Sequence, residues 1–142
     1  MSNLPPATAP LTALVVDDES TIRFLAAQAL QIAGFQVEEA ADAGEAFAAL
    51  ETHTPDAILI DARLPGISGF DLCKAIRRRP DGTRVPILMM TGMDAVAMHP
   101  WAQEVGANGI VGKPLDLLSL GQEVRRLAEH AASAGGAPGP CE

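Results

Sequence analysis

The sequence predicts an α/β protein built on a doubly wound, five-stranded parallel sheet with helices on both faces. Two observations carry this prediction. Five short apolar runs alternate with longer segments whose apolar residues recur at helical spacing. The runs also lack polar alternation, which is typical of parallel strands covered on both faces. The expected strands are Leu14–Val16, Phe35–Val37, Ala57–Ile60, Ile87–Met90 and Asn108–Val111.

Each expected helix has apolar residues that share one face, which we expect to be buried. These residues are Ile22, Leu25, Ala29 and Ile32 in the first helix; Ala43, Ala46, Phe47 and Leu50 in the second; Leu72, Cys73 and Ile76 in the third; and Leu117, Leu120, Val124, Leu127 and Ala128 in the last. Ser20 and Asp116 are placed to cap the first and last helices, and Gly34 to end the first. Gly66 and Gly69 form the turn before the third.

The segment between the fourth and fifth strands contains a proline. Inside a helix proline removes an N–H donor and clashes with the preceding turn, but it suits the first turn. We therefore expect this helix to begin near His99–Pro100 and Met93–Met98 to form a loop. Trp101, the only tryptophan, is expected to be a partly buried packing residue.

The length of 142 residues fits one domain. We expect a flexible leader over residues 1–10, which hold three prolines, and the folded domain over 11–130. Residues 131–142, rich in Ala, Gly and Pro, are expected to be a disordered tail or the stub of a linker. Cys73 and Cys141 are too few for a disulfide framework or a zinc site, and Cys73 is expected to fill the core.

The charge and hydropathy of the sequence limit the classes of partner that the protein can have. The net charge of −8 argues against a duplex-DNA binder, which needs a basic stripe, and is compatible with an acidic pocket that recruits a cation. No apolar run approaches the ~20 residues of a membrane helix. The opening MSNLPPATAP lacks the basic and apolar parts of a secretory signal. We therefore expect a cytoplasmic protein with neither nucleic acid nor membrane as a partner.

Polar side chains follow four of the five expected strands. Asp17 and Asp18 come after the first, Asp61 after the third, Thr91 after the fourth and Lys113 after the fifth. Singly, each has an ordinary explanation as a helix cap, a turn residue or a solvated lysine. The carboxyl ends of parallel strands meet at one edge, where doubly wound sheets bind ligands. Together the five residues predict a site with three carboxylates, a hydroxyl and an ammonium group.

This set of groups favours phosphoryl chemistry. Crowded carboxylates raise one another's proton affinity unless a cation screens them. Mg²⁺ prefers one or two carboxylates, waters and phosphate oxygens, so Asp17 and Asp18 suggest a Mg²⁺ site. Asp61, single and central, is the expected nucleophile, because a carboxylate beside the metal can attack a phosphoryl donor to give an aspartyl phosphate. The metal, Lys113 and Thr91 would then share the phosphoryl oxygens.

The residues stand in segments that resemble the receiver domain of bacterial two-component response regulators, over about Leu11 to His130. The matching segments are VVDDES, ILIDARLPGISG, ILMMTG and GANGIVGKP, with 30 residues from Asp61 to Thr91 and 22 from Thr91 to Lys113. The resemblance implies a flavodoxin-like fold with strand order 2-1-3-4-5, as in stand-alone, chemotaxis-type regulators.

The resemblance also implies roles for the site residues. Asp61 would accept phosphate from a sensor histidine kinase or a histidine phosphotransfer protein. Asp18, Asp61 and the main-chain carbonyl of Arg63 would bind Mg²⁺ directly, and Asp17 through water. Thr91 would bond one phosphoryl oxygen.

Lys113 would pair with another phosphoryl oxygen, and the resemblance implies a cis bond between Lys113 and Pro114. A receiver is no enzyme in the turnover sense, since it assists only its own phosphoryl transfer and autodephosphorylation. It would signal by contact with a downstream protein. Whether it forms a homodimer, stands alone or regulates an attached effector domain stays open.

Ile110 stands where many receivers carry Tyr or Phe, so we do not expect the usual Thr–aromatic switch. Arg63, two residues after Asp61, is expected to project over the pocket mouth, either without a role or obstructing the water that hydrolyses the phosphoryl bond or steering a partner. Gly92 is expected to keep the pocket open.

The same residues allow three rival interpretations. A haloacid-dehalogenase-type phosphotransferase needs Asp-x-Asp after the first strand, where this chain has Asp17-Asp18-Glu19. A phosphate-binding loop needs Gly where Ala107 stands and Ser or Thr where Pro114 stands. An unphosphorylated pseudo-receiver that serves only as a docking module is separated from a working receiver by phosphorylation of Asp61.

Overall fold

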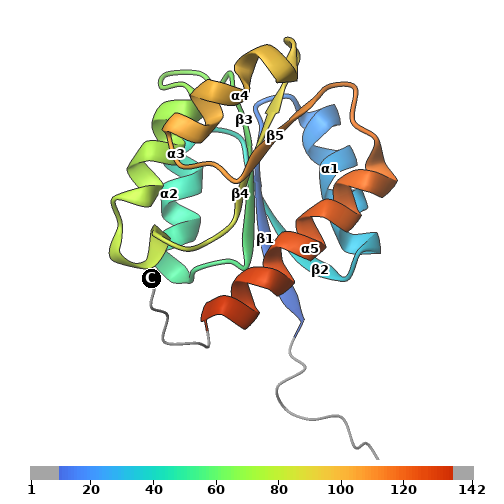
Figure 1. The fold of residues 1–142 in the computed structure, drawn as a ribbon, viewed down its shortest axis with the longest axis vertical. Helices are drawn as coiled ribbons and strands as arrows, with labels where there is room; N and C mark the ends of the chain where they lie inside the picture. Colours follow the sequence, from blue (N-terminus) through green and yellow to red (C-terminus); the bar gives the residue numbers. More distant parts are fainter. Residues whose placement is uncertain (1–9, 136–142) are drawn as a thin grey trace, which may run out of the picture.

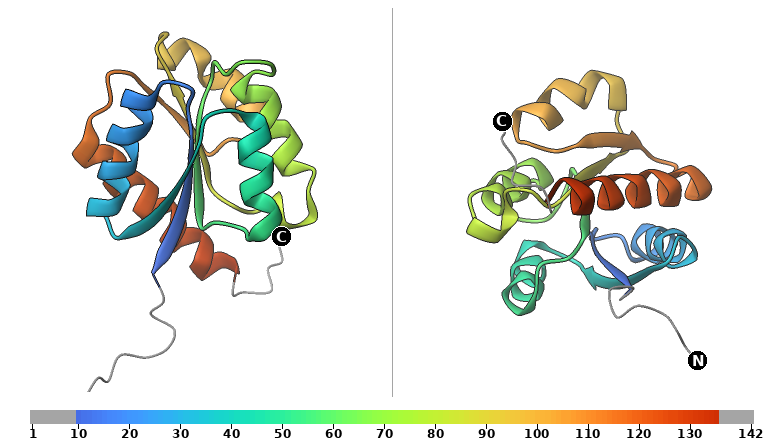
Figure 2. Two further views of the ribbon diagram at one scale, coloured as in Figure 1. Left: turned by 180° about the vertical axis from the view of Figure 1, so that it is seen from behind. Right: turned by 60° about the horizontal axis from the view of Figure 1, so that its bottom comes forward.

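The computed structural model describes residues 10–135 and forms the expected doubly wound sheet. Strand and helix bounds are β1 (Leu11–Val16), α1 (Ser20–Ile32), β2 (Phe35–Ala40), α2 (Ala43–Thr52), β3 (Ala57–Asp61), α3 (Gly69–Arg77), the 3₁₀ turn η2 (Pro80–Gly82), β4 (Ile87–Thr91), α4 (Ala95–Glu104), β5 (Gly109–Gly112) and α5 (Leu117–Gly135). All strand pairs are parallel, in the order β2-β1-β3-β4-β5. Helices α1 and α5 cover one face of the sheet, and α2, α3 and α4 cover the other (Figures 1 and 2). The predicted fold class and strand order are confirmed.

Successive residues of the interior strands pack into two separate cores. Ile58 and Ile60 of β3 join the core under α2, α3 and α4, whereas Leu59 between them joins the core under α1 and α5. Side chains alternate between the faces of a strand, so an all-apolar strand serves both cores. Cys73 is buried in the first of these cores, as expected.

Helix α1 differs from the expectation at its start and along its face. Glu19, and not Ser20, is the N-cap, and its side chain makes no capping hydrogen bond. Leu25 and Ile32 are exposed, at 36% and 81%, because the buried face is formed by alanines and Leu30. Small residues let α1 approach α5 closely, and a Cβ on Gly121 would lie 2.9 Å from the Ala29 carbonyl oxygen.

The predicted signals at Gly34 and Asp116 are confirmed, whereas Gly69, expected in the turn before the third helix, is the first residue of α3. Gly34 ends α1 with a left-handed φ of 104°, which favours glycine. Asp116 accepts a hydrogen bond from the backbone N–H of Ser119 at the start of α5. The expected α5 stripe is buried at Leu120, Val124 and Ala128.

The predicted start of the fourth helix near Pro100 is wrong. Helix α4 begins at Ala95, because the Asp94 side chain accepts hydrogen bonds from the N–H groups of Val96 and Ala97. Pro100 lies inside the helix and costs one hydrogen bond, to the carbonyl of Val96. Both residues are exposed, so that carbonyl can be hydrated instead. Trp101 is also more exposed than expected, at 59%.

The ends of the chain are only partly described. Helix α5 continues to Gly135, so residues 131–135, expected to belong to a disordered tail, are helical. The rest of the expected tail, 136–142 with Cys141, and residues 1–9 of the expected leader lie outside the described residues. Within residues 10–135, no helix is both long and apolar enough to cross a membrane.

Candidate functional site

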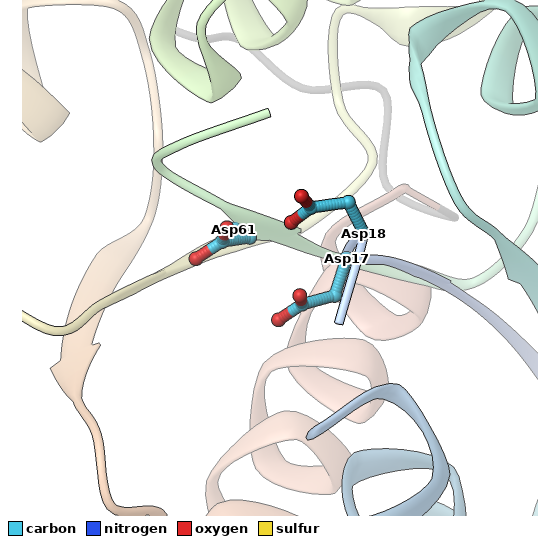
Figure 3. Close-up of side chains that lie close together, drawn as sticks. All are labelled: Asp17, Asp18 and Asp61. Carbon is cyan, nitrogen blue, oxygen red and sulfur yellow. The ribbon is translucent and has the colours of Figure 1, made fainter. Parts of the chain in front are cut away.

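The structure brings all five predicted site residues to one edge of the sheet. Asp17 and Asp18 directly follow β1, Asp61 and Thr91 are the last residues of β3 and β4, and Lys113 directly follows β5. The chain leaves β1 for β2 on one side and returns to β3 on the other, so strand order reverses between β1 and β3. The three aspartates therefore flank the switch point, where such sheets bind ligands. Their carboxylates extend toward the same side (Figure 3).

The three aspartates form a group with the chemistry of a divalent-cation site. One carboxylate oxygen from each of Asp17, Asp18 and Asp61 lies within 4.8 Å of the others. Asp17 is fully buried, Asp61 is 4% exposed, and Asp18 is exposed. Hard cations take oxygen ligands of this kind, and one exposed ligand leaves an open side for water.

Asp17 carries an unsatisfied oxygen that fits this interpretation. Its Oδ1 accepts a hydrogen bond of 2.8 Å from the N–H of Glu19. Its Oδ2 is the only buried side-chain polar atom without a hydrogen-bond partner in the described part of the chain. Lys113 Nζ lies 3.1 Å from this oxygen, and the two groups form an ion pair. A buried carboxylate oxygen that accepts no hydrogen bond is costly, and a bound cation would offset its charge.

Lys113 is held among carboxylates. Its Nζ lies 2.9 Å from Asp61 Oδ1 and 3.5 Å from Glu19 Oε1, in addition to Asp17. Burial alone would lower the pKa of Lys113, but its hydrogen bond with Asp61 and its charge interactions with Asp17 and Asp61 outweigh burial and raise the pKa. Its backbone N–H donates to the Thr91 carbonyl at 2.7 Å, and the bond to Pro114 is cis, as the resemblance implied.

Asp61 has an altered proton affinity. Burial raises the pKa of its carboxyl; the hydrogen bond from Lys113 lowers it, and the charges of Asp17 and Asp18 raise it, with a net rise. A bound cation would favour the charged, nucleophilic form, because an opposite charge nearby acts against burial.

Thr91 is 1% exposed, and its Oγ1 accepts a hydrogen bond of 3.0 Å from the N–H of Met93. The hydroxyl hydrogen is therefore free to be donated elsewhere. No atom lies within 4 Å of where a Cβ on Gly92 would be, so this residue leaves space, as expected.

An open cavity of about 450 Å³ gives access to the site. Its lining residues are Asp18, Glu19, Asp61, Arg63, Gly92 and Lys113. Arg63 is exposed and lines the cavity, which agrees with the expectation that its side chain projects over the pocket mouth.

Glu19 and Arg23 contact the site residues, although no role for either is predicted from the sequence. Glu19 belongs to the acidic run that marks the site, but only the folded chain brings it to Lys113. Arg23, one turn into α1, donates from Nη1 to the Asp17 carbonyl at 2.6 Å and pairs with Glu39 at 3.0 Å. Arg23 thereby fixes the backbone that carries the paired aspartates. Nothing in the sequence pattern singles it out.

Comparison with known proteins identifies the family. Residues 13–125 match the family model described as the response regulator receiver domain. The alkaline phosphatase synthesis transcriptional regulatory protein SphR of Synechococcus elongatus is 36% identical over 138 residues, covering 90% of this chain and 53% of that protein. The phosphate regulon transcriptional regulatory protein PhoB of Pseudomonas aeruginosa is 38% identical over 103 residues, covering 72% of this chain and 45% of that protein. The chain thus spans about half the length of these curated relatives.

Solved structures give the same result at nearly full length. The chemotaxis response regulator CheY4 of Vibrio cholerae superposes with a TM-score of 0.78 at 34% identity, covering 84% of this chain and 99% of that one. A putative response regulator from Chloroflexus aurantiacus gives 0.80 at 35% identity, covering 85% and 99%. Receiver domains are in general non-enzymatic signalling modules that bind Mg²⁺ at a cluster of aspartates, and such a cluster is present here. The chain therefore belongs to the receiver-domain family of two-component response regulators.

Proposed function

We propose that Asp61 is the phosphoacceptor and takes its phosphoryl group from a phosphohistidine of a sensor kinase or a histidine phosphotransfer protein. One observation supports Asp61 over its neighbours. It is the only aspartate of the group that both contacts Lys113 and lines the open cavity. Asp17 contacts Lys113 but does not line the cavity, and Asp18 lines the cavity without contacting Lys113.

The proposed step is a direct phosphoryl transfer. A carboxylate oxygen of Asp61 forms a bond to phosphorus while the P–N bond to the donor histidine breaks. The electron pair of that bond stays on the imidazole nitrogen, which then takes up a proton. Lys113 and Thr91 each donate a hydrogen bond to a phosphoryl oxygen, and such preorganised donors stabilise charge that develops in transfer.

The proposal includes a Mg²⁺ ion. Asp18, Asp61 and the main-chain carbonyl of Arg63 would bind it directly, and Asp17 would bind it through water. When bound, it supplies positive charge that offsets the negative charge of the carboxylates and the phosphoryl oxygens. Two observations support this assignment: Oδ2 of Asp17 is buried without a hydrogen-bond partner, and the three carboxylates lie close together.

The output proposed is a phosphorylation-dependent contact with a downstream protein in the cytoplasm, without nucleic acid or membrane as a direct partner. The phosphoryl group would later be lost by autodephosphorylation at the same site. Ile110 is half-buried and carries no hydroxyl, so the change of contact surface would not use an aromatic switch. A second candidate is control of an attached effector domain, favoured because SphR and PhoB are named transcriptional regulators and are about twice the length matched.

Phosphorylation in vitro tests the proposal. Wild-type protein incubated with Mg²⁺ and acetyl phosphate is expected to gain one phosphoryl group by intact mass, and Asp61→Asn none. Asp71→Asn, an exposed acid on α3 outside the site, is the matched control and should behave as wild type. A phosphoryl group retained by Asp61→Asn would contradict the assignment. If the wild-type protein gains no phosphoryl group from acetyl phosphate or from kinases, the alternative of an unphosphorylated pseudo-receiver that serves only as a docking module would be favoured.

A further inference from the structure

Glu19 is the acidic side chain of the cavity that stands outside the aspartate group. The oxygens that lie within 4.8 Å of one another come from Asp17, Asp18 and Asp61 alone. Glu19 lines the same cavity, and its side chain is 64% exposed, yet its Oε1 reaches to 3.5 Å from Lys113 Nζ. A cation held by the aspartates would leave the charge of Glu19 with Lys113 as its partner.

Glu19 stands at a position where a side chain normally caps a helix. It is the N-cap residue of α1, with φ −87° and ψ 113°, but its side chain caps nothing. In α2, α3 and α4 the N-cap side chains of Asp42, Ser68 and Asp94 accept hydrogen bonds from the first turn. Short polar side chains are preferred at the N-cap because their oxygen can accept a hydrogen bond from a backbone N–H of the first turn. At α1 a longer acid replaces the cap and extends to Lys113 instead.

Lys113 has three N–H donors and three carboxylates around them. Under the proposed function, two of these carboxylates would change on phosphorylation, since Asp61 would lose its charge in the acyl phosphate and the charge of Asp17 would be offset by the cation. Glu19 keeps its charge, lines the same cavity and is largely exposed to solvent. Glu19 is therefore placed to compete with an incoming phosphoryl group for the ammonium.

We propose that Glu19 is a positioning residue that holds Lys113 in its resting place and thereby restrains phosphorylation of Asp61. The resting contact stands by itself, whereas its effect on transfer rests on the proposed function. Two variants separate contact from charge. Glu19→Gln removes the charge at constant size, and Glu19→Asp keeps the charge but shortens the reach by one methylene. Glu51→Gln, at an exposed acid on α2, is the matched control.

The first measurement is the initial rate of phosphorylation by acetyl phosphate with Mg²⁺, over a range of donor concentrations. Both Glu19 variants are expected to be faster than wild type by about two- to fivefold, the scale of one partly exposed ion pair. Glu51→Gln should match wild type. A faster Glu19→Gln beside an unchanged Glu19→Asp would overturn the proposal, because charge alone would then explain the effect. Unchanged or slower rates in both variants would also overturn it.

The second measurement needs no phosphorylation. The chain contains only two lysines, Lys74 and Lys113, so ¹⁵N-lysine labelling gives two side-chain signals. In metal-free protein, Glu19→Gln is expected to shift the Nζ signal of Lys113 and leave Lys74, on α3, in place. An unmoved Lys113 signal would refute the resting contact. If the wild type takes up no phosphate, the proposed function fails, while this signal still decides the contact.

Discussion

Gly69 packs so closely against Asp61 that a Cβ at position 69 would lie 2.0 Å from the Asp61 carbonyl oxygen. The N–H of Gly69 also donates to the carbonyl of Ala62 at 2.9 Å. The first residue of α3 therefore rests on the backbone of the proposed nucleophile. Because the atom in the way is backbone, no side-chain rotation can relieve the clash.

Gly69→Ala is expected to lower the free energy of unfolding by about 1–3 kcal/mol, the usual cost of overpacking, and to reduce phosphorylation of Asp61. Urea unfolding followed by circular dichroism measures the first effect. Gly92→Ala is the control for stability, since no atom lies within 4 Å of its Cβ position. Equal stability of Gly69→Ala and wild type would show that the loop moves freely away from β3.

Asp61→Asn is expected to stabilise the metal-free protein at neutral pH. Burial raises the native pKa of Asp61 above its ordinary value of 3.8, so the unfolded chain releases this proton first as pH rises. The contribution of Asp61 to stability is fully present below pH 3.8 and is lost as pH rises through the native pKa. The gain from Asp61→Asn should therefore appear at neutral pH and vanish in acid.

Chemical unfolding of the two proteins over this pH range, with chelator present, measures the effect. Asp71→Asn serves as control because it is exposed on α3. A less stable Asp61→Asn at pH 7 would mean that the ion pair with Lys113 outweighs the cost of burial.

Mg²⁺ is expected to stabilise the wild-type protein and to stabilise Asp18→Asn much less. A ligand at 100 times its Kd adds about 2.7 kcal/mol to the free energy of unfolding. Asp18 is exposed, so its substitution should alter binding with little effect on the metal-free fold. Thermal unfolding across a Mg²⁺ titration measures both. An equal response of Asp18→Asn and wild type would remove Asp18 from the ligand set.

Arg63→Gly is expected to speed autodephosphorylation. The exposed Arg63 side chain lines the cavity through which water must reach the phosphoryl group. Removing it should raise the decay rate by about two- to tenfold, a barrier change of at most ~1.4 kcal/mol. The measurement is loss of phosphate from isolated phosphorylated protein after the donor is removed. Identical decay of the two proteins would leave Arg63 without a role in hydrolysis.

The placement of the site was predictable because it follows from topology. A parallel sheet brings the carboxyl ends of its strands together, so Asp17, Asp61, Thr91 and Lys113 had to share an edge once the strands were identified. Their separate roles, by contrast, depend on angles and distances that the pattern does not encode.

The errors arose where local pattern competes with packing. Leu25 and Ile32 repeat at helical spacing, but the neighbouring alanines fit the narrow space against α5 better. Proline normally ends or kinks a helix, but α4 continues through Pro100 because Asp94 caps its start and Pro100 lies on the exposed side. The contact of Glu19 with Lys113 joins residues 94 positions apart, a separation that spacing rules cannot reach.

The double packing of β3 has a mechanical consequence. Every residue of this strand is buried, with layers of helices on both sides and a hydrogen-bonded strand along each edge. Asp61 thus lies at the end of a fully buried interior strand, whereas Met93 and Arg63 lie on exposed connections beside it. If Asp61 takes up a phosphoryl group as proposed, we expect the structural change to begin in those exposed connections and not in the buried strand.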